Sequence, residues 1–211
     1  MAEIAAVISD FGGVLTSPLL DAFRTFQERS GVPVEALGTA MAALWERQGA
    51  HPLFELECGR MSEASFLEAL SAELTAQLGR EIHLHGFGER YFEALDPNEE
   101  LIEYMRALRG RGYRMAICTN NVREWEPLWR AKLPVEEIFE VVVDSAFVGA
   151  RKPEPRIFEI TLERLGVAAG QALLLDDVEQ NCEAARELGL HAVWYRSNAQ
   201  AIADIEALLA G

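Results

Sequence analysis

Short apolar runs alternate with amphipathic helical segments through much of the chain, and this alternation limits the folds that the sequence can adopt. Apolar strands separated by helices are typical of a parallel sheet that is covered by helices on both faces. We therefore predict an α/β fold with a doubly wound, Rossmann-like parallel-sheet core. The predicted strands are residues 4–9, 114–118, 139–143, 172–175 and 191–195.

The first strand is separated from the others by a long helical zone. Leu19, Leu20, Phe23 and Phe26 recur at helical spacing, and no convincing strand pattern occurs between residues 17 and 95. We therefore predict a core domain made of residues 1–16 and 96–211, with residues 17–95 inserted as an all-helical cap domain. Asp96 and Pro97 predict the start of the next helix, with Asp96 as its N-cap. Further helices are predicted near residues 122–133, 156–165 and 179–188.

The charge and cysteine content exclude several classes of protein. A formal net charge of −15 argues against binding to nucleic acid or to an anionic membrane surface. The longest stretch without a charge has 11 residues, which is too short to span a bilayer. Three widely spaced cysteines form neither a disulfide framework nor a zinc pattern, so we expect a reducing, cytoplasmic location.

Polar side chains follow the predicted strands, at the sheet edge where parallel sheets bind ligands. Crowded carboxylates repel one another unless a cation lies among them, and oxygen ligands suit Mg²⁺. A lysine beside such a metal suits a phosphate, and a carboxylate can attack phosphorus to form an aspartyl phosphate. The pattern thus favours metal-assisted phosphoryl chemistry. The residues concerned are Asp10, Thr119, Asn120, Lys152, Asp176 and Asp177.

Four segments, in this order along the chain, resemble the motifs of the haloacid dehalogenase-like (HAD) hydrolase superfamily. Residues 149–155 and the pair Asp176–Asp177 with Asn181 most resemble the phosphatase domain of soluble epoxide hydrolases, and they also resemble bacterial sugar-phosphate phosphatases of the same branch. That branch carries a helical cap after the first motif, as residues 17–95 would here. The segments are residues 10–16, 119–121, 149–155 and 176–181.

The resemblance implies a Mg²⁺-dependent phosphatase that acts on a small phosphorylated metabolite. Asp10 would be the nucleophile, and Lys152 would steady it and neutralise the phosphoryl charge. Thr119 and Asn120 would bind the phosphoryl group. The implied metal ligands are Asp10, the Gly12 carbonyl and Asp177, with Asp176 close by and Asn181 bracing the acidic loop. The sequence leaves open whether the protein is a monomer or a homodimer.

Gly12 departs from the pattern of most phosphatases in the superfamily, which carry a second aspartate at this position. That aspartate protonates the leaving group and then activates water. General acid–base catalysis contributes about 10²- to 10⁴-fold in rate, so we expect slow turnover with an initial burst. His51 or Glu55 could substitute for the missing group, but nothing in the sequence selects one of them.

Other functions stay open at this point. Dehalogenases of the superfamily also lack the second aspartate, but they need no Mg²⁺, and the pair Asp176–Asp177 favours a metal. A phosphotransferase and a non-catalytic phosphate-binding or regulatory domain are the remaining alternatives. Trp125, Trp129 and Cys118 are interpreted as packing residues.

Overall fold

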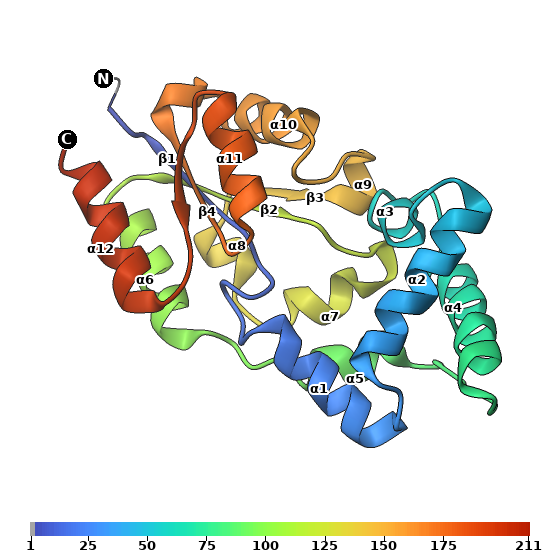
Figure 1. Cartoon of the computed structure of the whole chain (residues 1–211). Coiled ribbons are helices and arrows are strands. Elements are labelled where there is room, and N and C mark those ends of the chain that lie inside the picture. The colour runs from blue at the N-terminus through green and yellow to red at the C-terminus, as the bar shows by residue number, and fades with distance from the viewer. Residues whose placement is uncertain (1–2) are drawn as a thin grey trace.

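The computed structural model describes residues 3–211 and contains a five-stranded parallel sheet (Figure 1). The strand order is β3-β2-β1-β4-β5, so the first strand lies at the centre of the sheet. After the long helical insertion, the chain therefore returns to add strands on both sides of β1. The strands are β1 (Ala6–Ser9), β2 (Arg114–Thr119), β3 (Val141–Asp144), β4 (Ala172–Asp176) and β5 (His191–Trp194).

Helices cover both faces of the sheet, as the apolar strands require. Successive strand residues point to opposite faces, so Val7 and Ile8 belong to two different hydrophobic clusters. The Val7 cluster includes residues of α6, α8 and α12, whereas the Ile8 cluster includes residues of α10 and α11. The helical elements outside the insertion are α6 (Glu99–Gly110), η1 (Arg123–Trp125), α7 (Glu126–Arg130), α8 (Val135–Ile138), α9 (Ser145–Val148), α10 (Pro155–Leu165), η2 (Ala169–Gln171), α11 (Glu179–Glu187) and α12 (Asn198–Leu209).

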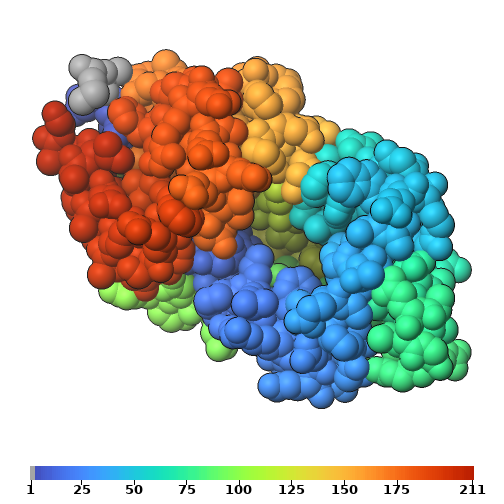
Figure 2. All heavy atoms as spheres, in the orientation of Figure 1, coloured from blue at the N-terminus to red at the C-terminus, as the bar shows by residue number. Residues whose placement is uncertain are grey.

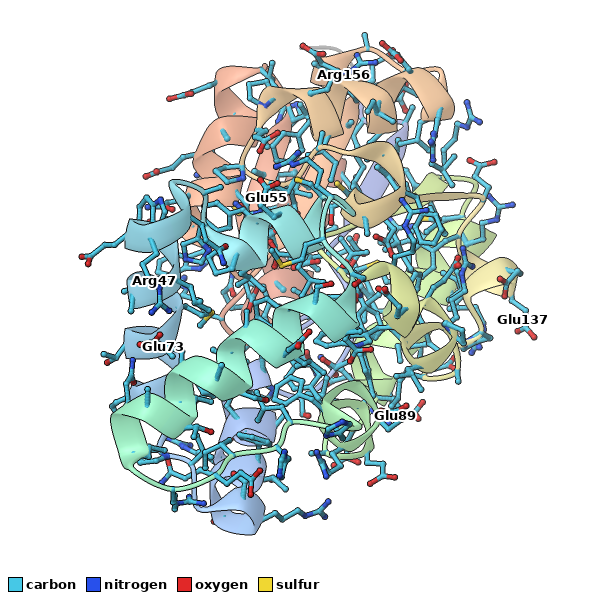
Figure 3. All side chains as sticks on the ribbon, turned by 90° about the vertical axis from the view of Figure 1, so that its right-hand side faces the viewer. Arg47, Glu55, Glu73, Glu89, Glu137 and Arg156 are labelled. Atoms are coloured by element: carbon cyan, nitrogen blue, oxygen red, sulfur yellow. The ribbon has the colours of Figure 1, made fainter. Side chains whose placement is uncertain are left out.

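The predicted insertion contains helices and no strand within residues 17–95. Its two longest helices, α2 and α4, pack together, and Arg47 of α2 pairs with Glu73 of α4 on the outer surface (Figure 3). The boundaries of a separate cap domain stay a prediction, and we refer to these elements as the inserted helices. They are α1 (Leu19–Ser30), α2 (Val34–Gln48), α3 (Pro52–Glu57), α4 (Glu63–Leu78) and α5 (Phe87–Glu93).

The chain passes between the sheet and the inserted helices through two paired segments. The prediction that Asp96 caps the next helix is wrong, because α6 has its N-cap at Asn98. The backbone carbonyl of Asp96 instead accepts a hydrogen bond from Ser17 N at 2.8 Å. Thr16 and Pro97 form an antiparallel bridge beside it. The Asp-Pro signal thus marks a junction of two chain segments.

The predicted helix over residues 122–133 is shorter and broken. A 3₁₀ turn, η1, precedes α7, in which Pro127 occupies one of the first two helical positions. Proline has no N–H to donate and is tolerated only in the first turn of a helix, so the helix restarts there. Trp129 and Cys118 are fully buried, as the packing interpretation requires.

No helix within residues 3–211 combines the length and apolar character needed to cross a membrane.

Candidate active site

The predicted site residues converge at the carboxyl ends of three adjacent strands. Asp10 follows β1, Thr119 ends β2, and Asp176 ends β4 with Asp177 directly after it. Because the sheet order reverses between β1 and β4, their loops diverge there and leave a crevice, where open α/β sheets bind ligands. Lys152 reaches this edge from the loop between α9 and α10.

Asp10 is held by one of its two carboxylate oxygens. Its Oδ1 accepts a hydrogen bond from the Phe11 backbone N at 2.7 Å and lies 2.9 Å from Lys152 Nζ. No hydrogen bond or ion pair between residues 3–211 uses Asp10 Oδ2. The contacts therefore orient the carboxylate and leave Oδ2 available.

Lys152 is buried between two carboxylates. Its Nζ lies 2.6 Å from Asp176 Oδ2 and 2.9 Å from Asp10 Oδ1, and its side chain is 1% exposed. Burial by itself lowers the pKa of Lys152, but the charges of Asp10 and Asp176 outweigh it and raise this pKa above its usual value. The lysine is therefore a fixed positive charge at the site.

The two adjacent aspartates differ in their surroundings. Asp176 is fully buried, and its Oδ1 accepts hydrogen bonds of 2.9 Å from Val178 N and from Asn181 Nδ2. Asn181 thus contacts this carboxylate directly, and its role in bracing the acidic loop stays a prediction. Asp177 is only partly buried, and its carboxylate forms no hydrogen bond or ion pair with another residue of the described chain. Asp177 thus has the freer carboxylate of the two.

The donor set fits a divalent cation. Asp10, Asp176 and Asp177 each offer one oxygen, and these oxygens lie within 4.8 Å of one another. Burial and the neighbouring carboxylates raise the pKa of Asp10 to about 7 and that of Asp177 to about 6. A hard cation among these oxygens would relieve the repulsion, and carboxylate oxygens are the ligands that Mg²⁺ prefers.

Gly13 allows Asp177 to approach the loop after β1. Gly13 has φ +78°, and a Cβ atom at this position would lie 2.4 Å from Asp177 Oδ2. Any side chain at position 13 would therefore displace this carboxylate. Gly13 was not predicted as a site residue, although its place within the first motif is a signal that could have indicated this role.

The structure gives the Asn120 side chain a different set of contacts from the predicted phosphate contact. Asn120 Nδ2 donates to the Lys152 carbonyl at 2.9 Å, and Lys152 N donates to Asn120 Oδ1 at 2.7 Å. Both polar groups of the amide thus hold the lysine loop in place. A phosphate role for Asn120 stays a prediction and would fall to its backbone N–H. Thr119 is buried beside it, with its hydroxyl 3.5 Å from the Asn120 carbonyl.

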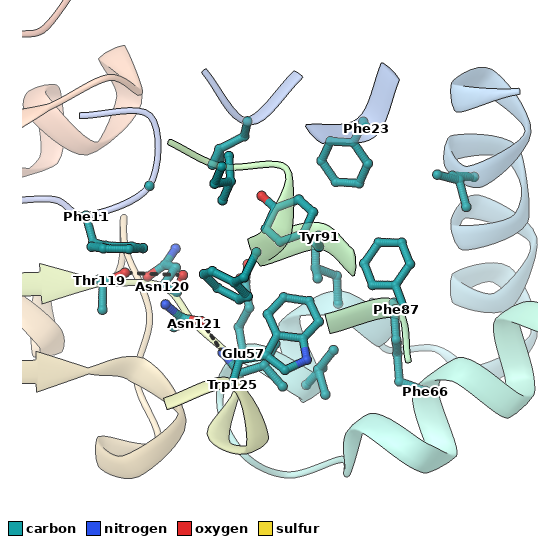
Figure 4. A pocket seen from close by; sticks show the side chains of 18 of the residues that line it. Phe11, Phe23, Glu57, Phe66, Phe87, Tyr91, Thr119, Asn120, Asn121 and Trp125 are labelled. Atoms are coloured by element: carbon teal, nitrogen blue, oxygen red, sulfur yellow. Dashed lines mark hydrogen bonds between the residues drawn. The ribbon is translucent and has the colours of Figure 1, made fainter. Parts of the chain in front are cut away.

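A cavity of about 240 Å³ joins this site to the inserted helices. Figure 2 shows the surface hollowed between the C-terminal half of the chain and the inserted helices. Residues of the site line one part of the cavity, namely Gly12 and residues 119–121, and aromatic rings from the inserted helices line another (Figure 4). A Cβ atom at Gly12 would lie 3.2 Å from Leu19 Cδ2, a side chain that also lines the cavity.

The two substitutes considered for the missing acid–base group lie outside this lining. Glu55 forms a two-pronged ion pair with Arg60, at 2.8 and 2.9 Å. His51 stacks on Phe54, with ring centroids 4.2 Å apart. The charged side chain that does line the cavity is Glu57, whose Oε2 lies 2.7 Å from Arg151 Nε. Glu57 was not one of the two residues considered from the sequence as a substitute acid–base group.

Comparison with known proteins identifies the class to which this fold and site belong. A family model described as haloacid dehalogenase-like hydrolase matches residues 4–189. The chain belongs to this family and is a hydrolase.

Several characterised proteins are similar to the chain. Acyl-CoA dehydrogenase family member 10 of Mus musculus is 27% identical over 97% of this chain, which spans only 19% of that protein. The phosphoserine phosphatase of Thermus thermophilus is 34% identical over 80% of this chain and 70% of its own length. The bifunctional epoxide hydrolase 2 of Mus musculus is 24% identical over 93% of this chain, which spans 37% of that protein.

Solved structures share the fold at lower sequence identity. A haloacid dehalogenase-like family enzyme of Bacteroides thetaiotaomicron, in complex with magnesium and inorganic phosphate, has a TM-score of 0.72 and 21% identity. The match covers 92% of this chain and 96% of that one. An L-2-haloacid dehalogenase matches over the full length of both chains, with a TM-score of 0.69 and 19% identity. A family enzyme bound to magnesium and phosphate and a dehalogenase thus share this fold.

Proposed function

We propose that the chain is a Mg²⁺-dependent phosphomonoester hydrolase that acts through a covalent phosphate on Asp10. The observation that carries this proposal is the asymmetric binding of the Asp10 carboxylate. Phe11 N and Lys152 Nζ hold Oδ1 at 2.7 and 2.9 Å, so Oδ2 is the oxygen left to attack. Similarity to a phosphoserine phosphatase at 34% identity supports phosphate esters as the substrates.

The reaction has two displacements at phosphorus. Asp10 Oδ2 forms a bond to phosphorus while the bond from phosphorus to the ester oxygen breaks, and the alcohol leaves after taking a proton. Water then attacks the phosphorus of the aspartyl phosphate, loses a proton, and releases inorganic phosphate and the Asp10 carboxylate. Lys152 balances the negative charge near the phosphoryl oxygens throughout.

The ligands proposed for Mg²⁺ are Asp10, Asp177 and the Gly12 carbonyl, with Asp176 next to them. When bound, the cation supplies positive charge to the phosphoryl oxygens. Asp176 is bound on both oxygens by Lys152, Val178 and Asn181. We therefore assign it the role of holding Lys152 and the acidic loop, and Asp177 the role of direct ligand.

The lack of an acid–base carboxylate at Gly12 affects the two displacements unequally. A leaving group of low pKa needs little protonation, so the first displacement proceeds with activated esters. The second displacement still lacks a base for its water. With such activated esters the aspartyl phosphate therefore accumulates, and product release shows a burst followed by slow turnover.

The experiment that tests the proposed function is a time course with p-nitrophenyl phosphate at increasing Mg²⁺. Asp10→Asn keeps the size of the side chain and removes the nucleophile, and Asp21→Asn on the exposed face of α1 is the matched control. Release that requires Mg²⁺, persists in the control and disappears in Asp10→Asn supports the proposal. Equal release by Asp10→Asn contradicts it, and release of halide from a 2-haloacid without Mg²⁺ would establish a dehalogenase instead.

A further inference from the structure

The cavity adjoins the site at one end and reaches the inserted helices at the other. Gly12, Thr119 and Asn120 line it on the side of the sheet. Leu37 and Met41 of α2 and Phe66 of α4 line it on the other side. A phosphoryl group at Asp10 would therefore direct its ester substituent into this space.

The lining of the cavity is overwhelmingly apolar. Figure 4 shows the rings of Phe23, Phe66, Phe87 and Trp125 facing a common space. In the described residues 3–211, no lysine, arginine or histidine lines it. Outside residues 119–121, the polar lining groups are the Tyr91 phenol, the Trp125 ring N–H and the Glu57 carboxylate. The Trp125 N–H donates to Glu63 Oε1 at 2.7 Å.

Glu57 does not make the cavity a site for a cationic substituent. Its Oε2 lies 2.7 Å from Arg151 Nε, and both side chains are 14% exposed. The Arg151 guanidinium also lies over the Phe54 ring, 3.8 Å from its centroid. The negative charge of Glu57 is therefore already paired, and a second cation would have to compete with a fixed guanidinium.

We infer that the substrates are phosphate monoesters of apolar alcohols, whose alkyl or aryl group occupies this cavity; this rests on the proposed function. Buried polar groups need hydrogen-bond partners, and this lining offers few to a polyol or an amino acid. The cavity volume of about 240 Å³ exceeds the roughly 150 Å³ of an apolar protein cavity that binds benzene. A substituent larger than one benzene ring therefore fits.

Such a substrate would react through the same two displacements at phosphorus as in the proposed hydrolysis. The bond between Asp10 Oδ2 and phosphorus forms as the phosphorus–oxygen bond to the alcohol breaks. The alcohol oxygen takes its proton from solvent water, because no acid stands at Gly12. Water then hydrolyses the aspartyl phosphate, and the apolar alcohol and phosphate are released.

The test compares kcat/KM for methyl, butyl, hexyl and octyl phosphate with that for glycerol 3-phosphate and phosphoserine. Each added methylene should raise kcat/KM about fourfold until the cavity is filled. Glycerol 3-phosphate should react no faster than methyl phosphate. Hydrolysis of p-nitrophenyl phosphate combined with no dependence on chain length would overturn the inference and leave the proposed function standing.

Two variants locate the effect in the cavity. Met41→Gln places an amide of similar size in the lining and should lower kcat/KM for octyl phosphate about tenfold, with little change for methyl phosphate. Leu20→Gln is the matched control, because Leu20 is 50% exposed and does not line the cavity. Equal effects of the two variants, or an equal loss for methyl phosphate, would contradict the assignment.

Binding of non-hydrolysable alkyl phosphonates gives a readout that does not depend on turnover. Their affinity, measured by calorimetry with Mg²⁺ present, should increase with chain length in wild type and in Asp10→Asn. If no ester is hydrolysed, the proposed function fails, and the phosphonate series alone decides whether the cavity binds apolar chains. A flat phosphonate series would then overturn the inference too.

Discussion

The Lys152 ammonium lies 2.6 Å from the Asp176 carboxylate, and both side chains are almost completely removed from solvent. Removing one partner of such a pair leaves an uncompensated buried charge, which costs about 3–5 kcal/mol. Lys152→Met keeps the aliphatic stem and should lower the free energy of unfolding by this amount in urea titrations. Arg156→Gln changes an exposed ion pair and should stay within about 0.5 kcal/mol of wild type.

A double variant separates the ion pair from simple packing. Lys152→Met combined with Asp176→Asn removes both charges, so it should be less destabilised than the sum of the two single variants. Additive losses would contradict a direct interaction between Lys152 and Asp176. The comparison requires the three variants and wild type at one pH and one salt concentration.

The close approach of the Asp177 carboxylate to Gly13 predicts that a side chain at position 13 displaces this carboxylate. Gly13→Ala places a methyl group 2.4 Å from Asp177 Oδ2 and also incurs the cost of a positive φ. Gly149→Ala is the matched control, since Gly149 has φ +71° and open space around its Cβ position. The control should lose about 1 kcal/mol of stability, the cost of a side chain in the left-handed region. Gly13→Ala should lose more and should also bind Mg²⁺ more weakly in calorimetric titrations, and equal Mg²⁺ affinity in both variants would contradict this role.

The raised pKa of the buried Asp144 carboxyl predicts that the folded protein loses stability as the pH rises. Burial raises this pKa from 3.8 to about 6, so between these values the folded protein keeps a proton that the unfolded chain has lost. Stability is therefore lost as the pH rises through this window. In Asp144→Asn the amide would keep an Oδ1 acceptor for Ala146 N, a bond of 2.9 Å in the structure, without the charge. The stability of this variant relative to wild type should therefore increase by about 2 kcal/mol between pH 4 and pH 7.5. A pH-independent difference in urea titrations would show that Asp144 does not titrate in this way.

Much of the fold follows from sequence periodicity, because the central strands β1 and β4 are buried apolar runs and helices such as α1 and α10 have an amphipathic face. The pattern predicted from sequence ends at Tyr195, whereas the structure adds α12. That helix packs on the sheet through Ala201 and Ile205, and its many alanines give a weak contrast between its faces. Tertiary packing rather than local pattern stabilises it.

The site was harder to predict in its details than in its location. Strand ends place Asp10, Thr119 and Asp176 at one edge, so their proximity follows from the parallel topology. The use of the Asn120 amide to bind the Lys152 backbone depends on the path of a loop, which residue spacing does not determine. The position of Glu57 at the cavity depends on how α3 packs beside α9, a contact between segments far apart in the chain.

An aspartate introduced at position 12 should increase the rate of turnover. The φ of Gly12 is not positive, so an aspartate is compatible with the backbone, although Leu19 must move because its Cδ2 would lie 3.2 Å from the new Cβ. Gly12→Asp, alone or with Leu19→Ala, should raise steady-state turnover by about 10²-fold and remove the burst. Gly12→Asn has a similar size and no acid–base group, so it should do neither. Equal rates for the Asp and Asn variants would show that position 12 cannot supply the missing group.

The most direct test of the account is to identify the residue that becomes phosphorylated. Wild type is mixed with p-nitrophenyl phosphate and Mg²⁺, quenched in acid during the burst, digested and examined by mass spectrometry. We expect one phosphoryl group on the peptide that contains Asp10, in an amount equal to the burst, and none in Asp10→Asn. Nitrophenol release by wild type without phosphate on Asp10, or with phosphate on another residue, would contradict it.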